Sequence, residues 1–213
     1  MNIAILGAFG LLGTRLCLFL EKKGHNVLRI GRSKIKPHNQ LKDLIFPKKI
    51  KIDVIINLVA LTNIEKCEKK PLEAYLTNAF YLREFLCNFH TESTHIIHIS
   101  TDHVYQGEGP HLEEEANPIN TYALTKYISE TYAEGFNSTI LRINYVGKSF
   151  LKDRLSLSDW IYKSLINKDP IVLFEDIIFN PLEVNDLCEF IHIVIFKRKK
   201  GTFNLGSNGS ISK

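Results

Sequence analysis

The sequence predicts an α/β fold, namely a doubly wound parallel sheet of the Rossmann type. Short apolar runs rich in Ile and Val alternate along the chain with longer stretches of helical periodicity. Continuous apolar runs of this length are typical of strands buried on both faces, as in parallel sheets. Strand, helix and strand in regular order favour right-handed crossovers within one sheet. A glycine-rich turn between the first strand and the first helix agrees with this prediction.

Five strands and three helices are expected between the start of the chain and Val146. The strand candidates are residues 3–6, 27–30, 54–58, 96–99 and 140–143. The first helix is marked by apolar side chains at helical spacing, which are Leu12, Leu16, Phe19 and Leu20. Two further helices are expected at about residues 71–89 and 122–133. Residues 1–146 are therefore predicted to form one dinucleotide-binding domain.

After Val146 the pattern changes, and residues 147–213 are expected to form a smaller appended region. Its expected elements are helices at 155–166 and 184–196 and short strands at 171–174 and 202–205. The chain ends in a Ser-rich stretch where Ser210 or Ser212 is suited to cap a further helix. The appended region is therefore expected to be partial, with the chain truncated after Lys213.

Composition excludes several classes of protein. With 45 % hydrophobic and 23 % charged residues, the chain is neither disordered nor fibrous. It has no apolar run near the roughly 20 residues that span a bilayer, so no membrane span is expected. A net charge of +4, scattered along the chain, gives no reason to expect nucleic acid as a partner.

The cysteines and the start of the chain predict a cytoplasmic location. The residues after Met1 lack the basic segment and long apolar run of a signal peptide. The four cysteines are far apart in the sequence, without a C-x-x-C pair, and are expected to be reduced thiols rather than disulfides or metal ligands. They are Cys17, Cys67, Cys87 and Cys188.

The glycine-rich turn reads Gly7-Ala-Phe-Gly-Leu-Leu-Gly13 and predicts a dinucleotide site. Glycines permit the tight turn and the close approach of a pyrophosphate, and the helix that follows offers free N–H groups. The alternative is a purely structural turn. After the second strand the chain has Arg32 and Ser33 where an acidic residue would select NAD, and this favours NADP. NAD stays an alternative, since Arg32 could be a solvated side chain at a strand end.

A strand end and a helix supply candidate catalytic groups. Thr101 ends the fourth strand, where side chains face the crevice of such a sheet. Tyr122 and Lys126 are spaced to project from one face of the next helix. A nearby ammonium group would lower the pKa of the tyrosine and suit it to general acid–base catalysis, while a threonine hydroxyl could bind a substrate carbonyl. The alternative for this spacing alone is an ordinary surface helix.

These motifs together resemble the extended short-chain dehydrogenases/reductases, and within them the dTDP-4-dehydrorhamnose reductase-like group of nucleotide-sugar enzymes. The resemblance covers essentially the whole chain. It rests on Asn78 and on residues 7–13, 53–62, 65–68, 100–105, 117–126, 141–147 and 180–187.

The resemblance implies a role for each matching residue. Tyr122 would protonate the sugar C4 oxygen, Thr101 would polarise the same carbonyl, and Lys126 would bind the nicotinamide ribose and tune Tyr122. The cofactor-binding residues it implies are Gly7, Phe9, Gly10, Leu11, Leu12, Arg32, Val59, Ala60, Asn78, Tyr122, Lys126 and Asn144. The substrate-binding residues are Thr101, Asp102, His103, Tyr145 and Asn180, with residues 147–213 as the partial substrate-binding region. No metal is implied, and the resemblance leaves a homodimer open.

Three departures limit the transfer of these roles. Phe9 stands where the family often has Thr. The segment between Arg32 and Asp53 is short and basic and shows no third strand with an acidic residue. His103 stands where the reductases tend to have Tyr and the 4,6-dehydratases have Glu, and we expect it to pack rather than to transfer protons.

The leading functional hypothesis is an NADPH-dependent reductase of a nucleotide-linked 4-keto-6-deoxysugar in surface polysaccharide biosynthesis. One alternative is a related epimerase or dehydratase. Another is a regulatory subunit that binds dinucleotide without turnover, although the presence of Thr101, Tyr122 and Lys126 together argues against it.

Overall fold

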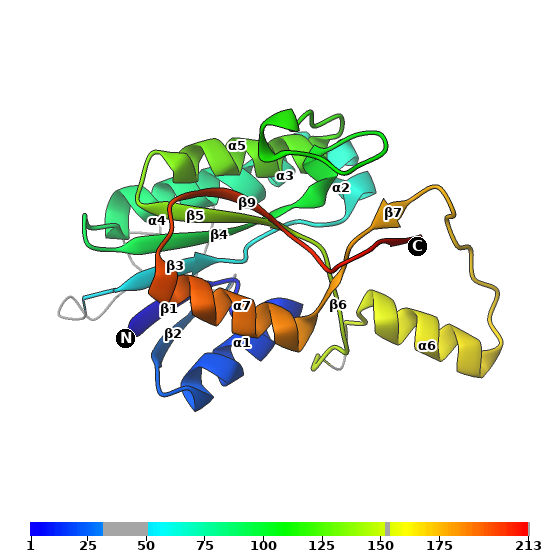
Figure 1. The fold of residues 1–213 in the computed structure, drawn as a ribbon, viewed down its shortest axis with the longest axis horizontal. Coiled ribbons are helices and arrows are strands. Elements are labelled where there is room, and N and C mark those ends of the chain that lie inside the picture. The colour runs from blue at the N-terminus through cyan, green and yellow to red at the C-terminus, as the bar shows by residue number, and fades with distance from the viewer. Residues whose placement is uncertain (32–50, 152–153, 213) are drawn as a thin grey trace.

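The computed structural model describes residues 1–31, 51–151 and 154–212, which form a parallel sheet with helices on both faces (Figure 1). The sheet has six strands in the order β2-β1-β3-β4-β5-β9, and every neighbouring pair is parallel. The predicted doubly wound α/β fold of the Rossmann type is thereby confirmed. The strands are β1 (Asn2–Leu6), β2 (Asn26–Ile30), β3 (Val54–Asn57), β4 (His95–Thr101), β5 (Ser138–Ile143) and β9 (Gly201–Leu205).

The strands are apolar on both faces because each face is covered by helices. In β1, Ile3 and Ile5 belong to one core cluster, whereas Ala4 and Leu6 belong to the other, and all four are fully buried. Side chains that alternate between two buried faces produce continuous apolar runs instead of an alternating pattern. This is why the five strand candidates were readable from the sequence.

One face carries α1 (Leu11–Lys22) and α7 (Val184–Lys197), and the other carries α4 (Tyr81–Phe89) and α5 (Thr121–Glu134) (Figure 1). The helix expected at 71–89 consists of α3 (Pro71–Tyr75), a π-helical turn η2 (Leu76–Phe80) and α4. The remaining helices of the described residues are α2 (Ile64–Lys69), α6 (Leu157–Asn167) and the 3₁₀ turns η3 (Asp102–Val104) and η4 (Glu113–Glu115).

The strand order reverses at β1, which creates a crevice beside its carboxyl end. From β1 the chain moves to one side to form β2 and then returns to place β3 on the other side of β1. Helices that follow neighbouring strands therefore leave in opposite directions, and ligands of open α/β sheets bind in the gap that results. The glycine turn lies directly after β1, at this point.

The chain after Val146 contributes to the main sheet as well as to an appended part. The sequence places 147–213 in one smaller region, yet β9 pairs with β5 and α7 packs on α1. The pairing of β9 depends on a contact between distant segments, which the order of elements along the chain does not reveal. The other strands of this part form two small sheets and are β6 (Tyr145–Val146), β7 (Ile178–Phe179), β8 (Leu182–Glu183) and β10 (Ile211–Ser212).

The strand expected at 171–174 is wrong. Residues 171–174 are irregular, and Val172, Leu173 and Phe174 are 71 %, 59 % and 50 % exposed. An apolar run forms a strand only where a partner strand accepts its hydrogen bonds, and among the described residues this run has no such partner. Ser212, considered as a helix cap, lies in β10.

Two predictions from composition can be compared with the structure. All four cysteines are free thiols, and three of them are buried. Within the described ranges, no helix is both long enough and apolar enough to cross a membrane.

Candidate active site

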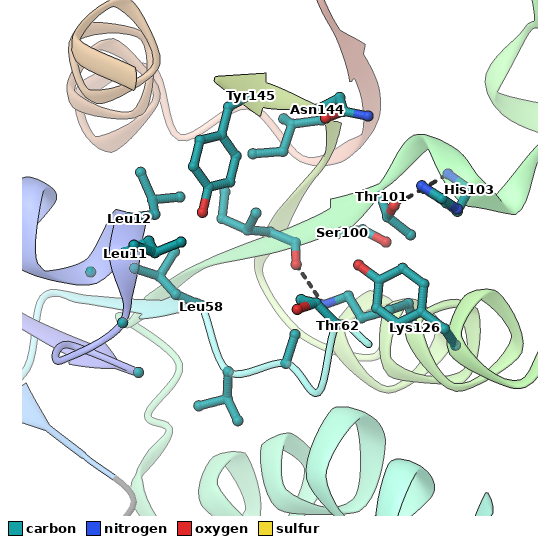
Figure 2. Close-up of a pocket in the computed structure, with 18 of the residues that line it drawn as sticks. Leu11, Leu12, Leu58, Thr62, Ser100, Thr101, His103, Lys126, Asn144 and Tyr145 are labelled. Atoms are coloured by element: carbon teal, nitrogen blue, oxygen red, sulfur yellow. Dashed lines mark hydrogen bonds between the residues drawn. The ribbon is translucent and has the colours of Figure 1, made fainter. Parts of the chain in front are cut away.

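A cleft of about 690 Å³ opens at the carboxyl ends of β1, β3, β4 and β5 (Figure 2). It brings the glycine turn together with the strand end at Thr101 and with α5. Of the predicted site residues, those that line it are Gly7, Phe9, Gly10, Leu11, Leu12, Val59, Ala60, Thr101, Asp102, His103, Tyr122, Lys126, Asn144 and Tyr145.

The glycines of the turn allow backbone segments to approach one another. Gly7 has φ +82°, a conformation that favours glycine. A Cβ atom on Gly13 would lie 2.2 Å from the Gly7 carbonyl oxygen, so α1 packs against the turn only because Gly13 has no side chain. Within the described chain, no side chain caps the start of α1 at Gly10. The first turn of α1 therefore presents N–H groups to the cleft, as a pyrophosphate site requires.

Tyr145 lies across this part of the cleft. The backbone N–H of Leu12 donates a hydrogen bond to the Tyr145 hydroxyl, which points toward the start of α1 (Figure 2). Burial raises the pKa of Tyr145. The side chain predicted to bind substrate thus lies against the helix end predicted to bind the cofactor, and it occupies the Leu12 N–H there.

Thr101 is fixed at the end of β4 by short-range contacts. Its side chain is buried, and its hydroxyl accepts a hydrogen bond of 3.2 Å from the His103 N–H. The hydroxyls of Thr101 and Tyr122 are hydrogen-bonded to each other. Asp102 follows directly and accepts a 3.0 Å hydrogen bond from the side-chain amide of Asn144. The strand end therefore presents one hydroxyl beside the tyrosine and one carboxylate that already has a partner.

The start of α5 is held in place so that its first two turns face the cleft. The Asn120 side chain accepts a 2.8 Å hydrogen bond from the Ala123 N–H, as a helix N-cap does. The Glu68 carboxylate accepts hydrogen bonds from both the N–H and the hydroxyl of Thr121, at 2.6 and 2.9 Å. These contacts place Tyr122 and Lys126, one turn apart, at the floor of the cleft.

Lys126 is almost fully buried and points at the strand next to Thr101. Its Nζ donates a 2.6 Å hydrogen bond to the Ile99 carbonyl oxygen (Figure 2). Burial lowers the pKa of Lys126 to about 8, and the nearby Glu130 carboxylate opposes this change. At neutral pH the side chain is therefore mostly an ammonium ion.

The pKa of Tyr122 moves opposite to the direction expected from the sequence. Burial raises it to about 12, while the hydrogen bond from Thr101 acts to lower it. The expectation was that the Lys126 ammonium would bring the pKa down. That expectation is wrong for this structure because Lys126 directs its Nζ at Ile99, so the loss of hydration around the phenol decides the direction.

His103 packs against the catalytic tyrosine candidate. Its ring meets the ring of Tyr122 edge to face, with centroids 5.7 Å apart. It also lines the cleft. This geometry agrees with a packing role.

Two of the predicted site residues that the structure describes, Asn78 and Asn180, are not in the cleft lining. Asn78 is buried behind it and hydrogen-bonds to Leu61 and Thr125, so it joins the loop after β3 to α5. Asn180 is exposed and donates its amide to the Gly209 carbonyl oxygen. Arg32, on which the choice of NADP over NAD depends, lies outside the described residues together with the short basic segment that follows it.

The cleft also contains residues that the sequence did not single out. The strands predict some of them, because Leu58 and Ser100 lie at or near the ends of apolar runs. Arg154 and Leu157 had no sequence signal, since they reach the cleft only through the path of the chain after β6. The additional lining residues include Leu58, Thr62, Ile64, Ser100, Arg154 and Leu157.

The sheet order and the glycine turn at its switch point define the class of the molecule, a Rossmann-type α/β protein. The family described as "RmlD substrate binding domain" matches residues 1–213. The chain therefore belongs to this family, which confirms the resemblance to the dTDP-4-dehydrorhamnose reductase-like group.

Relatives from several organisms agree with this assignment. The chain is 28 % identical to the spore coat polysaccharide biosynthesis protein SpsK of Bacillus subtilis, over 99 % of this chain and 75 % of that protein. Among solved structures, a hypothetical dTDP-4-dehydrorhamnose reductase from Sulfolobus tokodaii is 30 % identical, with a TM-score of 0.84 over 100 % of this chain and 78 % of the other. The dTDP-4-dehydrorhamnose reductase of Bacillus anthracis, in complex with NADP, is 26 % identical, with a TM-score of 0.82 over 99 % and 76 %.

Proposed function

We propose that this protein is an NADPH-dependent reductase of the short-chain dehydrogenase/reductase type. Its substrate would be a nucleotide-linked 4-keto-6-deoxysugar, as in dTDP-4-dehydrorhamnose reduction, and its product would serve surface polysaccharide biosynthesis. The observation that carries the proposal is that Thr101, Tyr122 and Lys126 line the same cleft as the glycine turn. The printed functions of SpsK and of the Bacillus anthracis enzyme support it. We assign the protein to the cytoplasm, in line with its four free thiols.

The residues around the turn fit a dinucleotide. Its pyrophosphate would lie on the first turn of α1, where Gly10, Leu11 and Leu12 line the cleft. A side chain at Gly7 would meet the Leu58 backbone at 3.0 Å, so the turn can lie this close to the end of β3 only with glycine. Val59 and Ala60 would border the nicotinamide half. Reduced nicotinamide, when bound, supplies the hydride that adds to the sugar C4 carbon.

Tyr122 is suited to give a proton to the sugar oxygen. With a pKa of about 12, its phenol keeps its proton at neutral pH, as a reaction that reduces a carbonyl requires. As hydride adds to C4, the carbonyl oxygen gains negative charge and takes the phenolic proton, which leaves a C4 hydroxyl. Thr101, hydrogen-bonded to the same phenol, is placed to donate to that oxygen. Lys126, one turn away and mostly an ammonium ion at neutral pH, would bind the nicotinamide ribose.

The experiment that tests this proposal follows NADPH absorbance after mixing the protein with dTDP-4-dehydrorhamnose. We expect the absorbance to fall, and Tyr122→Phe to slow the fall by about a hundredfold or more because the proton donor is lost. Tyr127→Phe is the matched control, since Tyr127 lies on the same helix but outside the lining of the cleft, and it should retain activity.

Other outcomes distinguish the alternatives. Conversion of the sugar with no net loss of NADPH would indicate an epimerase or dehydratase. Binding of NADPH without consumption with any keto-sugar would contradict the reductase and favour a regulatory subunit.

A further inference from the structure

Behind the cleft, α5 and β5 hold an ion pair that the proposed reaction does not use directly. Arg142 donates to the Glu130 carboxylate through Nε, at 3.1 and 3.2 Å, and through Nη2, at 2.6 Å. Both side chains are buried, at 4 % and 0 % exposure. A buried pair of this kind seldom adds net stability relative to apolar residues of similar volume. Its presence calls for an explanation beyond folding energy.

The ion pair connects both sides of the candidate site. Glu130 lies one turn beyond Lys126, which itself lies one turn beyond Tyr122, so the three share a face of α5. The Glu130 carboxylate also accepts a hydrogen bond from the Ser100 hydroxyl, and Ser100 directly precedes Thr101 on β4. One carboxylate thus touches the strand that presents Thr101 and belongs to the helix that presents Tyr122 and Lys126.

Arg142 extends the network toward the other side of the strand end. Its Nη1 donates to the Tyr105 hydroxyl and to the Glu113 carbonyl oxygen, each at 2.6 Å. The Tyr105 hydroxyl donates in turn to Asn204 of β9 at 2.7 Å. Each of these bonds would be weakened if Arg142 turned to follow a displaced carboxylate. The position of Glu130 is therefore set by the surrounding structure.

Glu130 also acts on the charge of Lys126. Burial disfavours the ammonium form of Lys126, and the Glu130 carboxylate favours it. The other titratable groups around the two residues belong to several elements. They are His98 on β4, Arg142 on β5, Tyr105 in the loop after η3, and Tyr122 and Tyr127 on α5, while Asp102 after β4 and Cys67 on α2 act on Tyr122.

We propose that Glu130, held by Arg142 and Ser100, is a positioning residue that keeps Lys126 charged and in register with the end of β4. Its role rests on the proposed function, in which the Lys126 ammonium would bind the nicotinamide ribose of the cofactor. The negative charge, rather than the volume of the side chain, is the property that Lys126 requires.

The test measures the titration of Lys126 directly, in protein without substrate or cofactor. The protein is prepared with isotope-labelled lysine, and the Lys126 NMR signal is identified by its loss in Lys126→Met. In Glu130→Gln, which keeps the shape of the side chain but removes its charge, we expect the midpoint of the Lys126 titration to move to lower pH by about one unit. Glu130→Asp, which keeps the charge, should restore most of the wild-type midpoint.

Two controls keep the test decisive. Ser129→Ala changes a buried neighbour on the same helix and should leave the midpoint unchanged. If Glu130→Gln does not fold, the double variant with Arg142→Gln replaces the pair by two amides. A smaller downward shift of the Lys126 midpoint is expected there, because the Arg142 cation, which opposes the charge of Lys126, is removed as well. Equal midpoints in wild type and in the folded neutral variant would overturn the proposal.

The titration is read without turnover, so its result stands apart from the proposed reaction. If the reductase activity is also found, its loss at alkaline pH should begin at a lower pH in Glu130→Gln than in Ser129→Ala. If Glu130→Gln shifts the titration midpoint of Lys126 but the wild type has no reductase activity, the positioning role is retained and the proposed function is rejected. If the wild type has reductase activity but Glu130→Gln leaves the Lys126 midpoint unchanged, the proposed function is retained and the positioning role is rejected.

Discussion

Gly13 shows how strongly a single position can depend on the absence of a side chain. Alanine is favoured over glycine in a helix interior by about 1 kcal/mol. Here, however, the added Cβ would lie 2.2 Å from the Gly7 carbonyl oxygen, a backbone atom that cannot turn aside. We expect Gly13→Ala to weaken NADPH binding at least about tenfold, a loss of 1.4 kcal/mol, as measured by calorimetric titration.

The matched control for this substitution is Gly135→Ala at the end of α5. Its Cβ would meet the Tyr132 carbonyl oxygen at 3.7 Å, an ordinary contact, and its φ of −65° suits alanine. NADPH affinity should be unchanged there. Equal affinities for wild type and Gly13→Ala would contradict the assignment of the turn to the cofactor.

Tyr122 and Lys126 show what a sequence can and cannot reveal about a side chain. Their spacing on α5 predicts that they share a face, because the geometry of a helix depends only on local order. The direction of the Tyr122 pKa was predicted wrongly, since it depends on burial and on where the Lys126 ammonium points. The Glu130–Arg142 pair had no sequence signal because it joins a helix to a strand through tertiary packing.

The π-helical turn η2 places Asn78 where it can join two elements. Its side chain accepts a 2.6 Å hydrogen bond from the Leu61 N–H and donates to the Thr125 hydroxyl at 2.9 Å. Asn78→Ala would leave the buried Leu61 N–H without this partner. We expect a loss of about 1–3 kcal/mol in the free energy of unfolding, measured with urea, because an unsatisfied buried donor is costly.

Asn88→Ala is the comparison for that substitution. Asn88 lies on α4 and its amide makes an exposed hydrogen bond to Glu84, so its loss should change stability by less than about 0.5 kcal/mol. Asn78→Ala should also reduce NADPH affinity, since Leu61 follows the cleft residues Val59 and Ala60. Reduced stability with unchanged affinity would restrict Asn78 to a structural role.

Helices and strands were predictable where local pattern and tertiary environment agree. The strands β1, β3, β4 and β5 are almost entirely buried, and β2 is partly buried, so their apolar runs could be recognised. The run at 171–174 is equally apolar, but it has no partner strand in the part of the chain that the structure describes, and Val172, Leu173 and Phe174 are exposed. The stretch at 71–89 has continuous helical periodicity, which does not distinguish the π-helical turn η2 from the α-helical turns on either side.

The topology of the molecule cannot be predicted in full from the order of helices and strands along the chain. The doubly wound class followed from alternation of strands and helices, and the structure confirmed it. The place of β9 beside β5 requires the chain to return to the main sheet after β6, α6 and β8. This return also brings Arg154 and Leu157 to the cleft, so the lining contributed by the last part of the chain was not predictable. Homodimer formation stays a prediction.

The central sheet buries histidines that are neutral in the folded protein, and this makes stability depend on pH. His98 is fully buried, with Nδ1 3.0 Å from the Asn57 amide nitrogen, and burial lowers its pKa well below the usual value. Burial lowers the pKa of His95 on the same strand as well. In the unfolded chain both titrate near pH 6.5, so protons favour the unfolded state as the pH falls below that value. The stabilising contribution is complete above about pH 6.5 and is lost progressively below it.

We therefore expect the urea concentration at the midpoint of unfolding to decrease as the pH is lowered from about 7.5 to about 5.5. His98→Gln, which keeps a polar group beside Asn57 but does not titrate, should show a smaller fall over the same interval. Asp159 does not contribute to the change over this pH interval. Hydrogen bonds from Ser149 and Ser156 lower its pKa below the usual carboxylate value, so its effect on stability appears only at lower pH. The other histidines whose pKa is lowered, His95 on β4 and His25, His90 and His192 outside the sheet, remain in both proteins and account for a residual dependence. An equal decrease of the urea midpoint in wild type and in His98→Gln would show that the His98 imidazole does not cause the loss of stability in acid.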